Sequence, residues 1–341
     1  MGTNLRPIIV KKVVSLEELR GGSFAVDANN ILYQFLSVIR TPDGTPLRDP
    51  QGGVTSHLAG LMYRSTRLIH NYGLKLVFVF DGKPHELKEG EIARRRKVRD
   101  EAMREWIRAK EAGDYATAFS KSVMTSRLTT PMVEDAKRLI KLMGIPHVQA
   151  PGEAEAQAAH MARKGDVWTS NSRDYDSLLF GTPRLVRYLT ISGEEFLPSK
   201  GVARPLEPEV VELGGLLTKL GISHEQLIDL AILIGTDFND GLRGVGAKTA
   251  LRLLRRYGRL EGLPAQFRSR LPSQYQKIRE IFLRPDVTDD YSLRYEGVDE
   301  EGLLRFLCDE RGFSMKRVSV VIKRMRRFYS GLTQASLKDW I

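Results

Sequence analysis

The sequence has very little cysteine, with Cys308 as the single thiol among 341 residues. One thiol can form neither an intrachain disulfide nor a thiolate metal cluster, and such a chain suits a reducing compartment. The sequence also lacks any apolar run near the roughly eighteen residues that cross a membrane, and its charged start has no hydrophobic secretion segment. A myristoylation signal is excluded too, because Arg6 stands where Ser or Thr is required.

Acidic residues are in the minority, with 42 Asp and Glu against 53 Lys and Arg. The net charge of +11 and the sequence pI of about 9.7 indicate a polyanionic partner, of which nucleic acid is the leading class. A basic surface can also serve solubility alone. Apolar residues make up 42% of the chain, enough for a sizeable core in one large or two ordinary domains.

Two short apolar runs each end in an acid. Residues 23–27 end at Asp27, and the nearly continuous apolar run 74–80 is followed by Asp81. Such runs are typical of buried parallel strands, and the carboxyl ends of these strands form the crevice of an open α/β sheet. The sequence therefore predicts an α/β fold with a central, mostly parallel sheet flanked by helices. Helices are expected over residues 29–39, 57–72 and 131–143.

The stretch from Pro151 to Asp176 supplies four more carboxylates in two close pairs. Pro-Gly at 151–152 followed by Ala-rich sequence predicts the start of a helix, and the apolar residues 167–169 predict a strand. Both places lie beside the expected crevice, which makes this stretch the candidate active site. The pairs are Glu153 with Glu155 and Asp174 with Asp176.

An apolar helix over residues 227–235 delivers a seventh acid, Asp237, and no histidine joins the set. Unit charges about 4 Å apart repel by roughly 4 kcal/mol at an effective dielectric near 20, so converging acids need bound cations. All-oxygen ligands suit Mg²⁺ or Mn²⁺, and two such ions can activate water and stabilise the leaving oxygen of a phosphodiester. Any one acid alone would more commonly be a helix cap or a solvated side chain.

One feature of the first pair conflicts with a regular helix. Positions i and i+2 point roughly 160° apart on a helix, so Glu153 and Glu155 cannot both ligate one ion from a helix interior. Either the first turn is irregular, or one of the two acts through water.

Residues 83–110 form a charge-dense helical stretch with ten Lys and Arg against six Asp and Glu. A solvated helix is one interpretation. The other is an arch or lid over the crevice, because Lys88 lies only seven residues after the strand-end Asp81. We expect residues 83–130 to be such an insert.

Glycines precede a basic helix near residue 247. Gly244 and Gly246 followed by Lys248 resemble the helix-hairpin-helix element of DNA-backbone binders, in which small residues let phosphate approach main-chain N–H groups. From Arg243 to Arg259 there are six basic residues and no acid, which favours this reading over a simple glycine turn. Residues 311–328 carry seven more basic residues and no acid.

Several motifs together resemble one family, the flap endonucleases, which are structure-specific 5′-nucleases of DNA replication and repair. They occur in the family's order and span nearly the whole chain. The resemblance implies an inserted helical arch and a helix-hairpin-helix, or helix-two-turn-helix, element. The motifs are Val-Asp27-Ala, Val-Phe-Asp81-Gly-Lys-Pro, Ala-Pro-Gly-Glu153-Ala-Glu155-Ala, Asp174-Tyr-Asp176 and Gly-Thr-Asp237-Phe.

The resemblance also implies roles for particular residues. Two Mg²⁺ ions, replaceable by Mn²⁺, would be shared out, with Asp27, Asp81, Glu153 and Glu155 serving mainly one ion and Asp174, Asp176 and Asp237 mainly the other. Lys88 and Arg95 match the family's catalytic basic pair, which faces the scissile phosphate. The expected DNA contacts are Tyr33, which would stack on the DNA, Arg94, and the hairpin residues Gly244, Gly246 and Lys248, where the family often binds K⁺ too.

The last residues resemble the sliding-clamp-binding peptide of replication proteins. Gln334, Leu337, Trp340 and Ile341 fall on its positions, although Ile341 replaces the final aromatic residue. The alternative is a tail helix that packs Leu337 and Trp340 on its own core. Because the chain ends at this motif without a basic tail, it resembles archaeal members. We expect a cytoplasmic, nucleoid-associated protein, or a nuclear one if the source is eukaryotic.

We therefore predict a monomeric, metal-dependent phosphodiesterase that cuts 5′ flaps in Okazaki-fragment maturation and repair, with 5′→3′ exonuclease activity and a PCNA-type clamp as partner. Two alternatives stay open: an exonuclease or RNase of the same superfamily, and a non-catalytic DNA-binding adaptor recruited by the clamp. The nuclease domain is expected to span residues 1–330, followed by a clamp-binding tail over 331–341. Within the domain we expect an N-terminal region over residues 1–82, the arch insert 83–130, an internal region 131–260 with the hairpin element 225–260, and C-terminal basic helices 261–330.

Overall fold

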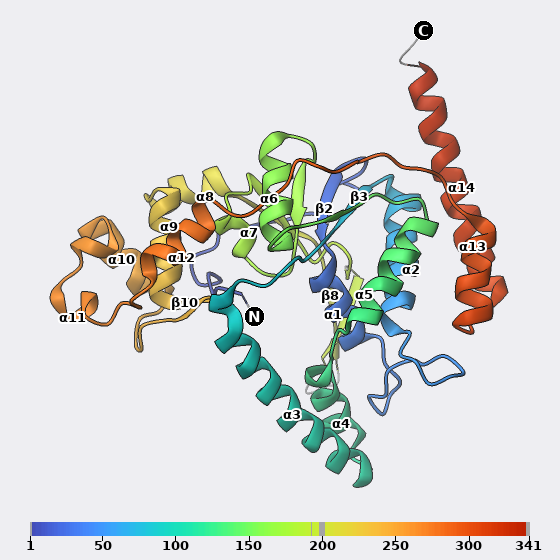
Figure 1. Ribbon diagram of the computed structural model, residues 1–341, viewed down its shortest axis with the longest axis horizontal. Coiled ribbons are helices and arrows are strands. Elements are labelled where there is room, and N and C mark those ends of the chain that lie inside the picture. Colours follow the sequence, from blue (N-terminus) through green and yellow to red (C-terminus); the bar gives the residue numbers. More distant parts are fainter. Residues whose placement is uncertain (1, 192, 198–201, 339–341) are drawn as a thin grey trace.

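The computed structural model describes residues 2–191, 193–197 and 202–338. Its centre is a seven-stranded sheet in the order β1-β9-β6-β5-β2-β3-β4 (Figure 1). The strands from β6 to β4 run parallel, while β9 and β1 pair antiparallel, so the expected mostly parallel sheet is confirmed. The strands are β1 (Lys12–Val13), β2 (Ser23–Asp27), β3 (Lys75–Phe80), β4 (His147–Gln149), β5 (Thr169–Asn171), β6 (Arg184–Arg187) and β9 (Glu209–Glu212).

Alternate side chains of the strands enter cores on opposite faces of the sheet, as the two-residue period of a strand requires. Phe24 and Val26 pack with the helices of one face, whereas Ala25 packs against α6 on the other. The first face is covered by α1 (Ala28–Val38), α2 (Ser56–Tyr72) and α5 (Thr130–Leu142), and the second by α6 (Ala154–Lys164) and α7 (Asp176–Leu179).

The predicted strand over residues 167–169 lies two residues later in the structure, as β5. Val167 is buried before the strand begins, and the Trp168 N–H donates to Ser23 Oγ and the Ser23 carbonyl at the start of β2. The apolar residues here precede the strand. The strand itself consists of the polar residues Thr169, Ser170 and Asn171.

The expected arch is a hairpin of two helices that projects from the body of the molecule (Figure 1). Helix α3 (Glu89–Glu111) buries only Ala102 and Ala109, and it packs on α4 (Tyr115–Ser122). Most of its other residues are exposed, which explains why the stretch is so rich in charge. The sequence expectations of a solvated helix and of an arch are thus both met by one element.

A second core lies at the opposite side of the molecule from α14. It joins the sheet to the hairpin region, whose elements are α8 (Leu213–Leu220), α9 (His224–Ile234), β10 (Gly235–Thr236), β11 (Asn239–Asp240), α10 (Ala247–Tyr257), α11 (Ala265–Arg268) and α12 (Tyr275–Leu283). Strands β7 (Gly193–Leu197) and β8 (Val202–Leu206) form a separate antiparallel hairpin.

Residues 285–299 form an extended strap without helix or strand that crosses from α12 to α13 (Glu300–Leu304) (Figure 1). Gln157 on α6 bonds the main chain of Thr288 on both sides, accepting from its N–H and donating to its carbonyl, each at 2.8 Å. The strap therefore connects α12 with α13, on opposite sides of the molecule (Figure 1), and is fixed to α6 between them.

The last helix, α14 (Met315–Lys338), is longer than the sequence suggested. The tail was expected to begin at residue 331, but the helix continues through Gly331 and Thr333, because one glycine costs a helix only about 1 kcal/mol. Gln334 and Leu337 of the clamp motif lie in its last turns, whereas Trp340 and Ile341 lie outside the described residues. Among the residues that the structure describes, no helix is long and apolar enough to cross a membrane.

Candidate active site

Asp27 and Asp81 stand at the carboxyl ends of neighbouring parallel strands. Asp27 ends β2 and caps α1, since its Oδ1 accepts a hydrogen bond from the Asn30 N–H at 3.0 Å. Asp81 follows β3, and its Oδ1 accepts from the Ala154 N–H at 2.8 Å, at the start of α6. Each acid therefore has one oxygen fixed by the first turn of a helix, and this orients its carboxylate at the edge of the sheet.

The conflict between Glu153 and Glu155 is resolved by the way α6 begins. Glu153 is the N-cap residue, with an extended backbone at φ −75° and ψ 132°, whereas Glu155 lies in the first helical turn. Because Glu153 stands outside the helix, the i, i+2 divergence of a regular helix does not apply to the pair. Ser177 Oγ donates to Glu155 Oε1 at 3.3 Å.

The second pair follows β5, with Asp174 on the loop and Asp176 as the first residue of α7. Asp174 Oδ2 accepts from Asn30 Nδ2 at 3.0 Å, and Asp176 Oδ1 accepts from the Thr3 N–H at 2.8 Å. Asp176 is also tightly covered by the start of the chain, because a Cβ added at Gly2 would come within 2.7 Å of its Oδ2. Position 2 therefore has no room for a side chain beside these acids.

Two cations from the arch reach the acids. Arg95 Nη2 donates to both oxygens of Asp237 at 2.8 Å. Lys88 Nζ pairs with Glu153 Oε2, lies 3.5 Å from Asp237 Oδ2, and sits 5.2 Å from the centre of the Phe238 ring. The base of the arch is thereby held on two of the acids, Glu153 and Asp237.

The carboxylates lie close enough together to shift one another's pKa. Burial, reinforced by the Asp81 carboxylate, raises the pKa of Asp27 well above its usual range. Burial and then Asp176 do the same to the pKa of Glu155, and burial with Asp237 and Asp174 raises the pKa of Asp176 to about 6. Burial also raises the pKa of Glu153, against the opposing effect of Lys88. These interactions connect all seven acids: Asp27, Asp81, Glu153, Glu155, Asp174, Asp176 and Asp237.

The donor set fits a hard divalent cation, because it consists of carboxylate oxygens without histidine or cysteine. Within residues 2–191, 193–197 and 202–338, however, no three His, Cys, Asp or Glu side chains stand close enough to hold an ion as they are. Lys88 and Arg95 pair with Glu153 and Asp237 as counter-ions. A divalent cation bound by these carboxylates would compete with the two ion pairs.

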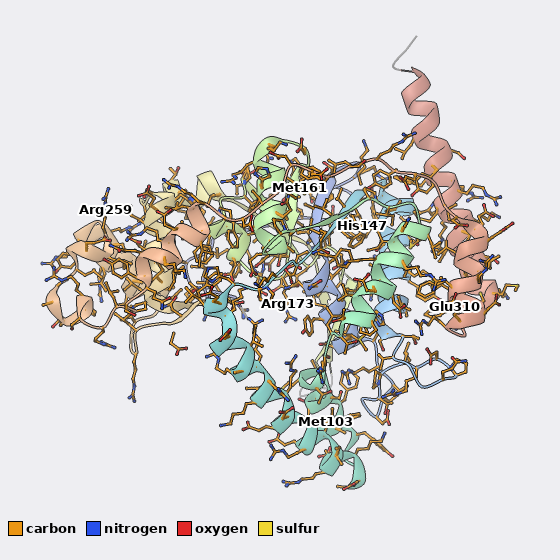
Figure 2. The ribbon with its side chains drawn as sticks, viewed as in Figure 1. Met103, His147, Met161, Arg173, Arg259 and Glu310 are labelled. Carbon is orange, nitrogen blue, oxygen red and sulfur yellow. The ribbon has the colours of Figure 1, made fainter. Side chains whose placement is uncertain are left out.

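Two further residues expected to contact DNA lie at the edge of this site. Tyr33 is exposed on α1, one helical turn after Asn30, so it shares a face with the residue that holds Asp174. Arg94 is exposed on α3 and lies 4.0 Å from Asp240 on β11. Arg173, just before Asp174, lies near the centre of the view, between the start of α3 and the sheet (Figure 2).

The glycine hairpin lies apart from the acids, at the start of α10. Gly244 has φ +83°, and Gly246 is the N-cap of α10 with no side-chain hydrogen bond to the helix. A Cβ added at either glycine would meet nothing within 4 Å. Nothing inside the protein therefore excludes a side chain at Gly246, and the small residues leave the helix N-terminus open to an outside ligand. Lys248 is exposed on the first turn beside them.

The structure also brings residues to the site that the sequence analysis did not single out. Asn30 and Ser172 bond the acids directly, and both lie within or next to motifs that contain them, so polar residues near the acids were a usable signal. Arg187 contacts the residues on both sides of Asp174, but nothing in its sequence surroundings distinguishes it from any other arginine.

Two family models match the segments that carry the acids, and both describe regions of the XPG family. Residues 3–102 match the XPG N-terminal domain, and residues 144–237 match the XPG I-region. "Flap endonuclease 1" of Methanothermobacter thermautotrophicus is 45% identical over 340 residues and covers 100% of both chains. The protein of the same name from Pyrococcus furiosus is 47% identical over 341 residues, which are 100% of this chain and 99% of the relative.

Solved structures agree with this grouping. Flap endonuclease-1 from Methanococcus jannaschii superimposes with a TM-score of 0.77 at 38% identity, over 97% of this chain and 99% of that one. The catalytic core of Rad2 in complex with DNA substrate has a TM-score of 0.71 at 22% identity, over 95% of this chain and 100% of that one, and it supports the fold alone.

Proposed function

The chain belongs to the flap endonuclease family of structure-specific 5′-nucleases, and on this premise we propose that its seven acids hold two Mg²⁺ ions at the point where a 5′ flap is cut. A flap endonuclease is a metal-dependent phosphodiesterase. The observation that carries the proposal is the gathering of all seven carboxylates at the carboxyl ends of β2, β3 and β5, within reach of two arch cations.

The division of the acids between the two ions follows the family resemblance. Electrostatic interactions run through the whole set, from Asp27 to Asp81, Asp174 and Glu153, and from Asp176 to Asp237 and Asp174, so two ions could share it. We assign Asp27, Asp81, Glu153 and Glu155 mainly to one ion and Asp174, Asp176 and Asp237 mainly to the other. The bound ions, with Mn²⁺ as a substitute, would supply water activation and charge neutralisation at the leaving oxygen.

Lys88 and Arg95 are the proposed catalytic cations. Both extend from the start of the arch to the acids, so a phosphodiester held at the acids lies beside them. Burial lowers the pKa of Lys88, but the Glu153 and Asp237 carboxylates outweigh burial and raise it above its usual value, so the side chain stays charged. Fixed cations at this place would stabilise the negative charge that develops on the phosphate in the transition state.

The duplex is held away from the acids, at the start of α10. The open N-terminus at Gly246, the neighbouring Gly244 and the exposed Lys248 suit a backbone phosphate, because the N–H groups point outward and no acid lies on the helix. We propose this hairpin, with a K⁺ ion, as the grip on the duplex downstream of the cut. Tyr33 and Arg94 would contact DNA nearer to the acids.

The tail is proposed to bind a sliding clamp of the PCNA type. Gln334, Leu337, Trp340 and Ile341 occupy the positions of a clamp-binding peptide, and α14 carries this end of the chain beyond the body (Figure 1). We further propose that the enzyme acts as a monomer at replication forks, in the cytoplasm of an archaeon.

The proposal is tested with four end-labelled DNAs: a 5′ flap, the same flap with a blocked 5′ end, a nicked duplex and a single strand. Each is incubated with Mg²⁺ and with a chelator. We expect rapid cutting of the free flap at its junction, slower cutting of the blocked flap because a threaded strand needs a free end, and no product with chelator. Release of single nucleotides from every DNA, including the nicked duplex at the flap's rate, would instead identify a 5′ exonuclease.

A further inference from the structure

Arg187 is a buried arginine that touches none of the seven acids, yet it lies beside the loop that carries two of them. It is the last residue of β6, whose parallel neighbour is β5, with Val186 opposite Asn171. The loop of Asp174 leaves β5 just after this pair. The register of the sheet therefore delivers Arg187 to the base of that loop.

The guanidinium grips the residues on both sides of Asp174. Arg187 Nε donates to the Arg173 carbonyl at 2.7 Å, and Nη1 donates to the Tyr175 hydroxyl at 2.5 Å. Residues 172–175 form no helix or strand, and the Arg173 and Asp174 N–H groups donate only to side chains, Asn30 Oδ1 at 3.4 Å and Ser172 Oγ at 3.3 Å. Arg187 adds a bond to the main chain at position 173 and one to the side chain at position 175, and so restrains the segment on both sides of Asp174.

The arginine is itself held from several directions. Its Nη1 also donates to Glu209 Oε2 at 2.9 Å, directly across the β6-β9 pair, and Nη2 donates to the Tyr188 hydroxyl at 2.9 Å. The guanidinium carbon lies 4.1 Å from the centre of the Tyr175 ring and 4.6 Å from that of the Tyr188 ring. A planar cation that contacts two rings and makes four hydrogen bonds has a defined orientation.

Tyr188 adds an independent sign of constraint. With φ +62°, it is the one non-glycine residue with a left-handed backbone in the described ranges. Such a conformation is unfavourable for a side chain with a Cβ and persists only where the surroundings enforce it. Here it brings the tyrosine back over the guanidinium of its own neighbour.

The loop needs such support because of the charges around it. The Asp174 carboxylate acts unfavourably on Asp27, Glu155 and Asp176, so repulsion drives Asp174 away from them. Asn30 holds the carboxylate from the α1 side. Arg187 holds the main chain from the opposite side, and no described residue other than Arg187 bonds both flanks of Asp174.

We propose that Arg187 is a positioning residue for the cation site: it holds the loop 173–175 so that Asp174 and Asp176 face the metal together. This inference rests on the proposed two-metal function. It assigns no catalytic contact to Arg187, which acts only through the loop. The contrasting explanation is a purely structural ion pair between Arg187 and Glu209.

The experiment compares Arg187→Lys, Arg187→Gln and the wild type in three measurements: Mg²⁺ affinity without DNA by calorimetry, the Mg²⁺ dependence of single-turnover flap cutting, and flap affinity in Ca²⁺. Residues that orient metal ligands typically contribute about 10- to 100-fold to metal affinity. We expect Arg187→Gln to weaken Mg²⁺ binding by at least about tenfold, with excess Mg²⁺ restoring much of the rate and flap affinity changed less than about twofold.

Arg279→Lys is the matched control. Arg279 is also partly buried, donates to Asp229 at 2.7 Å and to Glu261 at 2.9 Å, and lies on α12, away from the acids. We expect Arg279→Lys to lower Tm without changing the Mg²⁺ dependence of flap cutting. If the Arg187 variants behave like Arg279→Lys, with lower Tm and normal Mg²⁺ affinity, the inference is wrong and the residue is structural.

Tyr175→Phe covers the case in which the Arg187 variants fail to fold. It removes one acceptor from Nη1 and leaves the Glu209 bond in place, so we expect an intact fold and a weaker Mg²⁺ affinity; an unchanged affinity would also overturn the inference. Failure of the wild type to cut any flap would overturn the proposed function instead, while the calorimetric comparison would still decide the role of Arg187.

Discussion

Lys88 offers a prediction in which two properties move in opposite directions. Its Nζ contacts Glu153 and lies 3.5 Å from Asp237, so in the metal-free protein it neutralises one acid of each proposed ion site. In Lys88→Met the apolar stem is kept and the charge is lost. We expect the variant to bind Mg²⁺ more tightly than the wild type and to cut DNA more slowly.

The magnitudes follow from the charges. Two unit charges about 4 Å apart interact by roughly 4 kcal/mol at an effective dielectric near 20, and part of this is offset by the desolvation of the lysine. If a third of one such interaction opposes the incoming ion, its removal is worth about 1.4 kcal/mol, a tenfold gain in Mg²⁺ affinity. Loss of a cation aimed at transition-state charge should cost about 10²–10³ in rate.

Calorimetry without DNA measures the first property, and single-turnover cutting of a labelled flap at saturating Mg²⁺ measures the second. Lys83→Met is the control, because it removes the same charge from an exposed residue of the same loop. It should alter neither property by more than about twofold, since exposed charges are screened. Weaker Mg²⁺ binding by Lys88→Met, or an equal gain in both variants, would refute the reasoning.

Four further predictions follow from other regions of the molecule. Asp174→Ala should abolish flap cutting and leave flap binding in Ca²⁺ largely intact, because the phosphates are gripped elsewhere; near-normal turnover would exclude its assignment to a metal. Lys248→Ala should weaken all duplex-containing DNAs about equally and make the salt dependence of binding shallower by about one unit, and a base-sequence preference in that loss would contradict a phosphate contact. Truncation after Leu332 should change free-enzyme cutting by less than about threefold, below 1 kcal/mol in barrier, yet abolish stimulation by a clamp, whereas a lower Tm would mean that the tail packs on the body. Burial, with the charge of Arg311, lowers the pKa of His57 to about 4, so between pH 6.5 and 4 the unfolded chain binds more protons and the free energy of unfolding falls by up to about 3 kcal/mol on acidification; chemical denaturation should show a flatter profile for His57→Gln.

The sequence was most informative where a pattern has a simple geometric meaning. Apolar runs that end in an acid predicted parallel strands with Asp27 and Asp81 at one edge, because such strands share the direction of their carboxyl ends. The charge-dense stretch after Asp81 predicted the arch, since a helix with only two buried alanines cannot belong to a core. These inferences needed only local periodicity.

The remaining features depend on contacts between distant segments. The pairing of Lys88 with Glu153 joins positions 65 residues apart, and the Arg187 bond to Arg173 depends on the register of two strands. The continuation of α14 past Gly331 was not predicted, because a single glycine was taken as the end of the helix. The residues around it favour helix. Contacts between distant segments leave no pattern in the spacing of residues along the chain. The acids could therefore be predicted from the sequence, whereas the residues that hold them in place could not.

The origin of the acids has a consequence for protein synthesis. They come from segments between residues 27 and 237, and the last of them enters the site from the end of α9. A ribosome releases these segments in order, so a chain interrupted between residues 176 and 237 has the first six acids and the arch but lacks the carboxylate that pairs with Arg95. Under the proposed assignment such a fragment lacks one of the seven metal ligands, so we expect it not to cut DNA.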